Sequence, residues 1–135
     1  MNKIQLVRYT PSTRDKVLHR LRNMSEAMPF HVGRHFVHEF PKIGLILACV
    51  EPATQLIPGS QHTYIEGDDF LTFDGVPLFE GQDVSRPWAQ RLFELFVRYG
   101  PAGFFDRVMG DYCVTVKHGP RLFAFGDFAG LCPIF

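Results

Sequence analysis

Three histidines stand close together, at a spacing that suggests a metal site. His31, His35 and His38 follow one another at i, i+4 and i+7, and on a helix they would share one face and form a plausible zinc or nickel cluster. The surrounding residues alternate in polarity as in a strand, however, and on a strand His38 would face away from the other two. The sequence therefore favours histidines that are partly buried or face solvent, with a metal-binding protein as an alternative hypothesis.

A second group of residues that could do chemistry is acidic. Glu66, Asp68 and Asp69 surround Gly67 just before an apolar run, and carboxylates this close together are candidates for a metal site or a general acid. Asp and Gly are also the residues that turns prefer, because they adopt turn backbone conformations readily. We expect this group to cap and solubilise a turn.

The cysteines offer no nucleophile. Cys49, Cys113 and Cys132 contain no Cys-x-x-Cys pair, and joining two of them would leave one thiol over. We expect reduced, mostly buried thiols in a cytoplasmic protein, because disulfides are rare in that compartment. Cys113 and Cys132 lie in apolar stretches, where burial generally leaves a thiol inert.

The bulk composition is that of an ordinary globular chain. Its 135 residues are close to the common size of one domain, so we expect a single domain over residues 1–135. The formal net charge is zero and the basic residues are scattered, which argues against a nucleic-acid partner. No apolar run reaches the roughly 18–20 residues that span a bilayer, so no membrane partner is expected.

The first half of the chain predicts a strand, a helix and two further strands. Residues 4–9 alternate like a strand, and Ser12 or Thr13 is placed to cap a helix. The apolar stripe of this helix is spaced by four, three and four residues: Val17, Leu21, Met24 and Met28. Two strand-like runs follow on either side of Pro41. The second, residues 43–50, is apolar on both faces, as in a strand buried between two layers.

The second half begins with a predicted hairpin. Asp74-Gly75 lies between the apolar runs 69–73 and 76–79, and a two-residue Asp-Gly loop between such runs is a strong hairpin signal. Pro77 restricts the second of these strands to an edge or a short stretch, because proline has no N–H to donate.

A helix and a last hairpin complete the predicted order. The helix covers residues 85–99 with Gly100 at its C-terminal end, and its apolar stripe consists of Trp88, Leu92, Leu95, Phe96 and Tyr99. The hairpin turns at His118-Gly119-Pro120. Helices interspersed with hairpins predict an α+β fold in which antiparallel sheet dominates.

The segment from Leu95 to Phe135 carries a longer pattern. A helix ends at Tyr99-Gly100, a Phe-rich element leads to Gly110-Asp111-Tyr112, and an apolar hairpin ends in a run with Asp127, Gly130 and Pro133. These features, in this order and spacing, resemble the class II glutamine-amidotransferase-like domain of the superfamily of asparagine synthetases, β-lactam synthetases and lasso-peptide cyclases.

The resemblance implies a fold and a set of roles. The fold would be the N-terminal-nucleophile amidohydrolase layout, with layered antiparallel sheets and flanking helices, here in incomplete form. Asp74-Gly75 falls where active members carry an Asn-Gly that helps to form the oxyanion site. Asp127, Gly130 and Pro133 would belong to the structural motif of the family.

Two departures from the family imply that catalysis is lost. Active members begin, after removal of Met, with a cysteine that attacks the amide of glutamine, whereas this chain has Asn2, which cannot be a nucleophile. The family also binds the α-carboxylate of glutamine through an arginine at the end of the second core strand. Glu51 falls near that place and would repel a carboxylate. We therefore expect no catalytic residue and a degenerate substrate site at Asn2, Glu51, Asp74 and Gly75.

The implied function is that of a non-catalytic amidotransferase-like module. Such a module would scaffold an asparagine-synthetase-type, ATP-dependent amide ligase, as the front part of a longer chain or as a separate subunit. No Ser-Gly-Gly-x-Asp-Ser pyrophosphate loop is present, so ATP and magnesium are expected only in the associated synthetase domain. A stand-alone, self-associating binding or regulatory protein is the other alternative hypothesis, beside metal binding.

Overall fold

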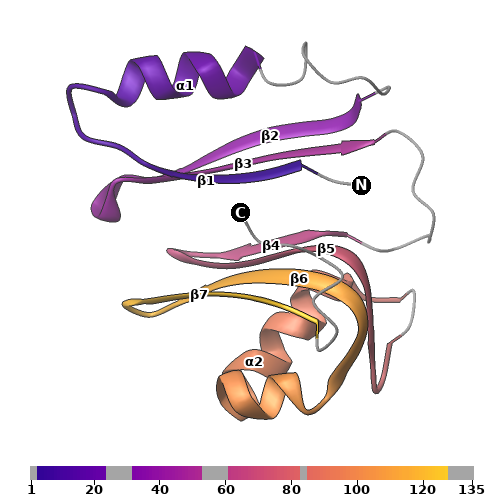
Figure 1. Cartoon of the computed structure of the whole chain (residues 1–135). Helices are drawn as coiled ribbons and strands as arrows, with labels where there is room; N and C mark the ends of the chain where they lie inside the picture. Colours follow the sequence, from indigo (N-terminus) through magenta and orange to yellow (C-terminus); the bar gives the residue numbers. More distant parts are fainter. Residues whose placement is uncertain (1–2, 24–31, 53–60, 83–84, 128–135) are drawn as a thin grey trace. The chain divides into compact units, whose positions relative to one another are not determined.

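Over the residues that the structure describes, the protein is a mixed α+β chain of two antiparallel sheets and two α-helices, which confirms the predicted α+β class. The computed structural model describes residues 3–23, 32–52, 61–82 and 85–127. Within these residues the chain divides into two compact units, Met1–Gln55 and Leu56–Phe135, and each unit is built on one sheet (Figure 1). No helix in the described ranges is long and apolar enough to cross a membrane.

The first unit is a three-stranded sheet with one helix. Its elements are β1 (Lys3–Arg8), α1 (Arg14–Arg22), β2 (Val32–Phe40), the short 3-10 helix η2 (Pro41–Ile43) and β3 (Leu45–Pro52). The strand order β1-β3-β2 makes β3 the central strand, and every side chain from Ile46 to Glu51 is buried. The predicted strands on either side of Pro41 are confirmed, as is the apolar character of both faces of the second.

Helix α1 lies along one face of this sheet (Figure 1). Leu18 and Leu21 pack in one cluster with residues of the central strand, Ile46, Ala48 and Val50. The predicted stripe is confirmed for Leu21 and for the partly buried Val17, while Met24 and Met28 lie outside the described residues. Thr13 occupies the N-cap position, as predicted, but its hydroxyl accepts a hydrogen bond from the backbone N–H of Thr10 and does not cap the helix.

The second unit is a four-stranded sheet with α2 packed on one face (Figure 1). Its elements are β4 (Thr63–Glu66), β5 (Asp69–Phe79), α2 (Trp88–Phe105), β6 (Val108–His118) and β7 (Arg121–Gly126), in the strand order β4-β5-β6-β7. The predicted hairpin around His118-Gly119-Pro120 is confirmed as β6 and β7. The phenylalanines fill the core: Phe96 and Phe104 of the helix contact Phe123 and Phe125 of β7.

The second helix is interrupted where the sequence predicts its end. Gly100 has a φ of 69° inside α2 and is followed by Pro101, so two helical segments meet at a kink. Trp88, Leu92 and Phe96 are buried as predicted, whereas Tyr99 is exposed.

The predicted hairpin at Asp74-Gly75 is wrong. β5 runs without interruption from Asp69 to Phe79 and pairs along its whole length with β6. The turn lies earlier, at Gly67-Asp68 between β4 and β5, where Gly67 has a φ of 62°. The acidic group of the sequence therefore does form a turn, as predicted.

A close approach of two strands explains the glycine at position 75. A Cβ there would lie 2.2 Å from the carbonyl oxygen of Asp111, and a Cβ at Gly110 would lie 2.3 Å from the carbonyl oxygen of Val76. Both glycines have positive φ, 90° and 101°, and such glycines mark bends and close backbone contacts within strands. Figure 1 shows β5 and β6 curving together. At Pro77, β5 has passed the end of β4 and pairs with β6 alone among the described strands. The predicted edge position of this proline is therefore confirmed.

Gly75→Ala is expected to destabilise the fold by about 3 kcal/mol or more. Left-handed strain contributes about 1–2 kcal/mol and overpacking about 1–3 kcal/mol. Gly67→Ala is the matched control, because its φ is also positive but nothing lies within 4 Å of the added Cβ. It should cost about 1 kcal/mol. Urea unfolding of both variants measures the difference, and equal losses of stability would contradict the close-approach explanation.

Candidate functional site

Two of the three histidines that suggested a metal site, His35 and His38, lie on opposite faces of one strand. Strand β2 places His35 on the face that carries α1, opposite Val50, and His38 on the other face, where its ring lies 4.6 Å from that of Phe40. The strand-based prediction is thus confirmed for these two residues, and His31 lies outside the described residues. Among the residues that the structure describes, no group of three His, Cys, Asp or Glu side chains could hold a metal ion.

The acidic group has a structural role through Asp69. Its carboxylate accepts hydrogen bonds from Lys117 Nζ at 3.0 Å and from the backbone N–H of Gly119 at 3.0 Å, and it contacts His118 Nδ1 at 3.1 Å. Partial burial acts to raise the pKa of Asp69, but the hydrogen bond and charge of Lys117 outweigh it and hold the pKa below its usual value. Asp69 thus joins the start of β5 to the β6–β7 turn.

The positions implied by the family resemblance are divided between the two units. Glu51 is buried at the end of β3, with Oε2 4.0 Å from Arg34 Nη1. Asp74 and Gly75 lie in β5, opposite Cys113 and Tyr112 of β6. Asn2 lies outside the described residues, as do Gly130 and Pro133.

The last residue that the structure describes also belongs to this set. Asp127 is buried, and its backbone N–H donates to the carbonyl oxygen of Tyr112 at 2.9 Å. This bond continues the pairing of β6 and β7 by one residue. That Asp127 belongs to the structural motif of the family stays a prediction.

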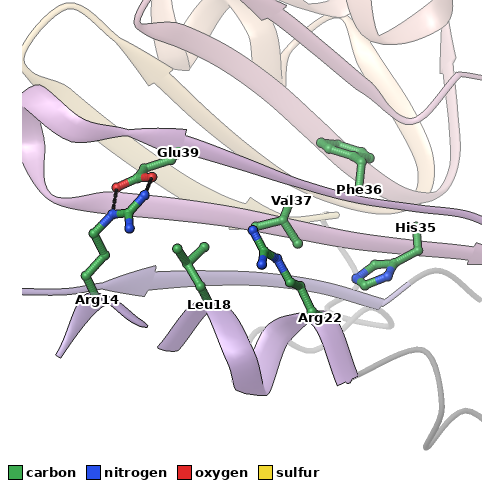
Figure 2. A pocket seen from close by; sticks show the side chains of 7 residues that line it. All are labelled: Arg14, Leu18, Arg22, His35, Phe36, Val37 and Glu39. Carbon is green, nitrogen blue, oxygen red and sulfur yellow. Dashed lines mark hydrogen bonds and ion pairs between the residues drawn. The ribbon is translucent and has the colours of Figure 1, made fainter. Parts of the chain in front are cut away.

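A pocket that the sequence prediction missed lies between α1 and β2. It has a volume of about 350 Å³ and is lined by Arg14, Leu18, Arg22, His35, Phe36, Val37 and Glu39 (Figure 2). Helix α1 supplies three of these residues, spaced by four along one helix face, and β2 supplies His35, Val37 and Glu39, spaced by two along one strand face. These two periods place the residues on one helix face and one strand face, but no local signal in the sequence shows that the two faces meet.

One end of the pocket is closed by an ion pair. Arg14 donates to both oxygens of Glu39, from Nε to Oε1 at 2.8 Å and from Nη2 to Oε2 at 2.7 Å, the bidentate geometry that suits guanidinium and carboxylate. The hydroxyl of Tyr9 donates to Oε1 as well. The hydrogen bonds from Arg14 lower the pKa of Glu39 to about 2, and acceptance by Glu39 raises the pKa of Tyr9. Both charges at this end are therefore mutually neutralised.

The other end of the pocket is cationic and has unused hydrogen-bonding capacity. The side chains of Arg22 and His35 both extend into the space between α1 and β2 (Figure 2). His35 Nε2 is buried and has no hydrogen-bond partner in the described part of the chain. Arg22 is exposed, and its guanidinium makes no hydrogen bond or ion pair with any residue that the structure describes. Leu18 and Val37 form apolar walls between the two ends. The arrangement can accept a negatively charged group.

Arg14→Gln is expected to raise the pKa of Glu39 from about 2 toward its ordinary value of 4.5, because the variant removes the charged donor. A carboxyl carbon NMR titration measures this pKa directly. Since the folded-state pKa is lowered, the pair stabilises the fold above pH 4.5, and that contribution is lost as the pH falls toward 2. Arg20→Gln, which removes an exposed charge from the same helix, should leave the titration unchanged. A Glu39 pKa unaltered by Arg14→Gln would contradict the assignment.

Comparisons of the chain with protein-family models, with curated proteins and with solved structures found no match.

Proposed function

We propose that this chain is a non-catalytic, glutamine-amidotransferase-like module that scaffolds an asparagine-synthetase-type amide ligase. The ligase would activate a carboxylate with ATP and magnesium and then accept an amine, with all reacting groups supplied by its own synthetase domain. The contribution of this chain would be to support the ligase, either covalently or as a subunit.

The observation that carries the proposal is the position of Glu51. β1 pairs with β3 so that Lys3 lies opposite Val50. The start of β1 and Glu51 are therefore at the same end of one sheet. In the family that the sequence resembles, this end would hold the nucleophile and the carboxylate-binding arginine. Here it holds a buried carboxylate, 2 % exposed, which would repel the α-carboxylate of glutamine.

The arrangement of each unit supports the finer fold proposal. In both units one antiparallel sheet carries a helix on one face, and the opposite face of the first sheet is also apolar, with Phe36, Leu47 and Cys49 along it. We propose that the fold is of the N-terminal-nucleophile type, with antiparallel sheets and flanking helices.

Introducing the missing nucleophile and removing the repelling charge of Glu51 tests the family assignment. Wild-type protein should release no glutamate from glutamine above the buffer blank. In an Asn2→Cys variant with Met1 removed, the new N-terminal thiol should react slowly with an electrophilic glutamine analogue. Adding Glu51→Gln should accelerate the labelling at least about tenfold, because the repelling charge is gone. Intact mass spectrometry measures labelling, and circular dichroism checks that each variant is folded.

Two results would contradict the proposal. Glutamate release by the wild-type protein would show that the chain is a glutaminase. Equal labelling of folded Asn2→Cys with and without Glu51→Gln would show that Glu51 does not face the carboxylate of glutamine.

A second candidate function is that of a stand-alone, self-associating protein, and an exposed apolar surface favours it. Leu78 and Met109 lie opposite each other on β5 and β6 and are 53 % and 72 % exposed, and Val76 lies on the same face. These segments of β5 and β6 pair with each other but extend past the residues that pair with β4 and β7. Each segment therefore has one neighbouring strand among the described residues. Exposed edges beside apolar side chains are sites where identical chains pair.

Under this second candidate the purified chain is a homodimer in solution. Replacing Leu78 and Met109 together by lysine should convert the dimer to a monomer, because it buries charges in the interface. Val97→Lys, at a residue of α2 that is 47 % exposed, should leave the dimer intact. Light scattering after size-exclusion chromatography measures the mass. A wild-type monomer at high micromolar concentration would contradict this candidate.

A further inference from the structure

We propose that the pocket between α1 and β2 binds a small organic anion. Its carboxylate or phosphate head group would contact Arg22 and His35, and a short apolar body would lie against Leu18 and Val37. This inference does not depend on the proposed function, because the pocket is on the α1 face of the first sheet and Glu51 is on the opposite face.

The charges around the pocket favour an anion. Arg14 and Glu39 neutralise each other through two hydrogen bonds, so Arg22 is left as the uncompensated charge among the lining residues. The carbonyl end of a helix carries about half a negative elementary charge, which would oppose an anion. Arg22 lies in the last turn of α1 and lines the pocket, and its full positive charge outweighs that half charge.

The hydrogen-bonding groups suit a head group with at least two oxygens. A guanidinium presents several N–H donors in a planar fork, which matches carboxylate and phosphate. Nε2 of His35 is buried without a partner among the described residues, and a buried nitrogen that lacks a hydrogen bond costs free energy. A bound oxyanion would satisfy both groups.

The walls and the volume limit the rest of the ligand. Leu18 is buried and Val37 is partly buried in the cluster under α1, so the middle of the pocket excludes polar groups. A volume of about 350 Å³ is at the lower end of the range for small-molecule sites. The ligand is therefore a small acid with an aliphatic portion and not a polymer.

Isothermal titration calorimetry on the full chain tests the proposal with four probes: acetate, hexanoate, inorganic phosphate and hexyl phosphate. The apolar walls should make hexanoate bind at least about tenfold tighter than acetate, and hexyl phosphate at least about tenfold tighter than inorganic phosphate, since several buried methylenes are worth about 0.8 kcal/mol each. Whichever of hexanoate and hexyl phosphate binds more tightly identifies the head group as carboxylate or phosphate. Hexylammonium should not bind.

Matched variants locate the binding site. Arg22→Gln and His35→Asn should each weaken binding of the better probe by about tenfold or more, as loss of a charged or buried hydrogen bond does. Arg20→Gln and His38→Asn are the controls: Arg20 is an exposed arginine on the same helix, and His38 is on the opposite face of the same strand. Both controls should bind like the wild type.

Three results would overturn the proposal: no saturable binding of any anionic probe at millimolar concentration, binding of hexylammonium as tight as that of hexanoate, or equal losses in the variants and their controls. If binding fails in this way, the proposed ligase-associated function is unaffected, because its test rests on Asn2 and Glu51.

Discussion

The carboxylate of Glu39 joins three elements of the first unit that are separate in the sequence. It accepts two hydrogen bonds from Arg14 at the start of α1 and one from Tyr9, just after β1, while its own backbone belongs to β2. Because the guanidinium fork fits the carboxylate in one plane, this contact fixes the first turn of the helix against the sheet. The rest of the pocket follows from that placement, since the same helix face carries Leu18 and Arg22 within the next two turns. Because this contact neutralises the charges of Arg14 and Glu39, the charge of the pocket is set by Arg22 at its other end.

The second unit depends on a constraint of a different kind, the absence of side chains. Gly75 and Gly110 allow neighbouring backbones to approach so closely that a Cβ at either position would meet a carbonyl oxygen. The bend that results lets β5 and β6 curve beside the aromatic core under α2 (Figure 1). At the opposite end of the same strand pair, Asp69 joins Lys117 to the turn that follows it. Backbone geometry at one end and a partly buried ion pair at the other thus define the sheet.

The periodicity of the sequence predicted most of the helices and strands. It failed where one local sequence fits two structures, such as a hairpin turn and a continuous strand, and only contacts with distant residues decide between them. The strand around His35, the helix after Thr13 and the break at Gly100 were all predicted, because each depends on neighbours within a few residues. Asp74-Gly75 has the local signature of a hairpin, but its glycine is required by a contact with Asp111, far away in the sequence. The pocket was missed for the same reason. The partners in its ion pair are 25 residues apart, and no local pattern shows which face of β2 a helix will cover.

The central claim is that this chain acts as part of an amide ligase and not by itself. The most direct test is to isolate the protein from its source cells with an antibody against this chain and to determine its intact mass and its bound proteins. We predict either a polypeptide several times larger than the 15.4 kDa of this chain, or a stoichiometric partner, carrying in either case a synthetase domain with a Ser-Gly-Gly-x-Asp-Ser loop. A 15.4 kDa protein isolated alone or as a homodimer, without such a domain, would contradict the claim.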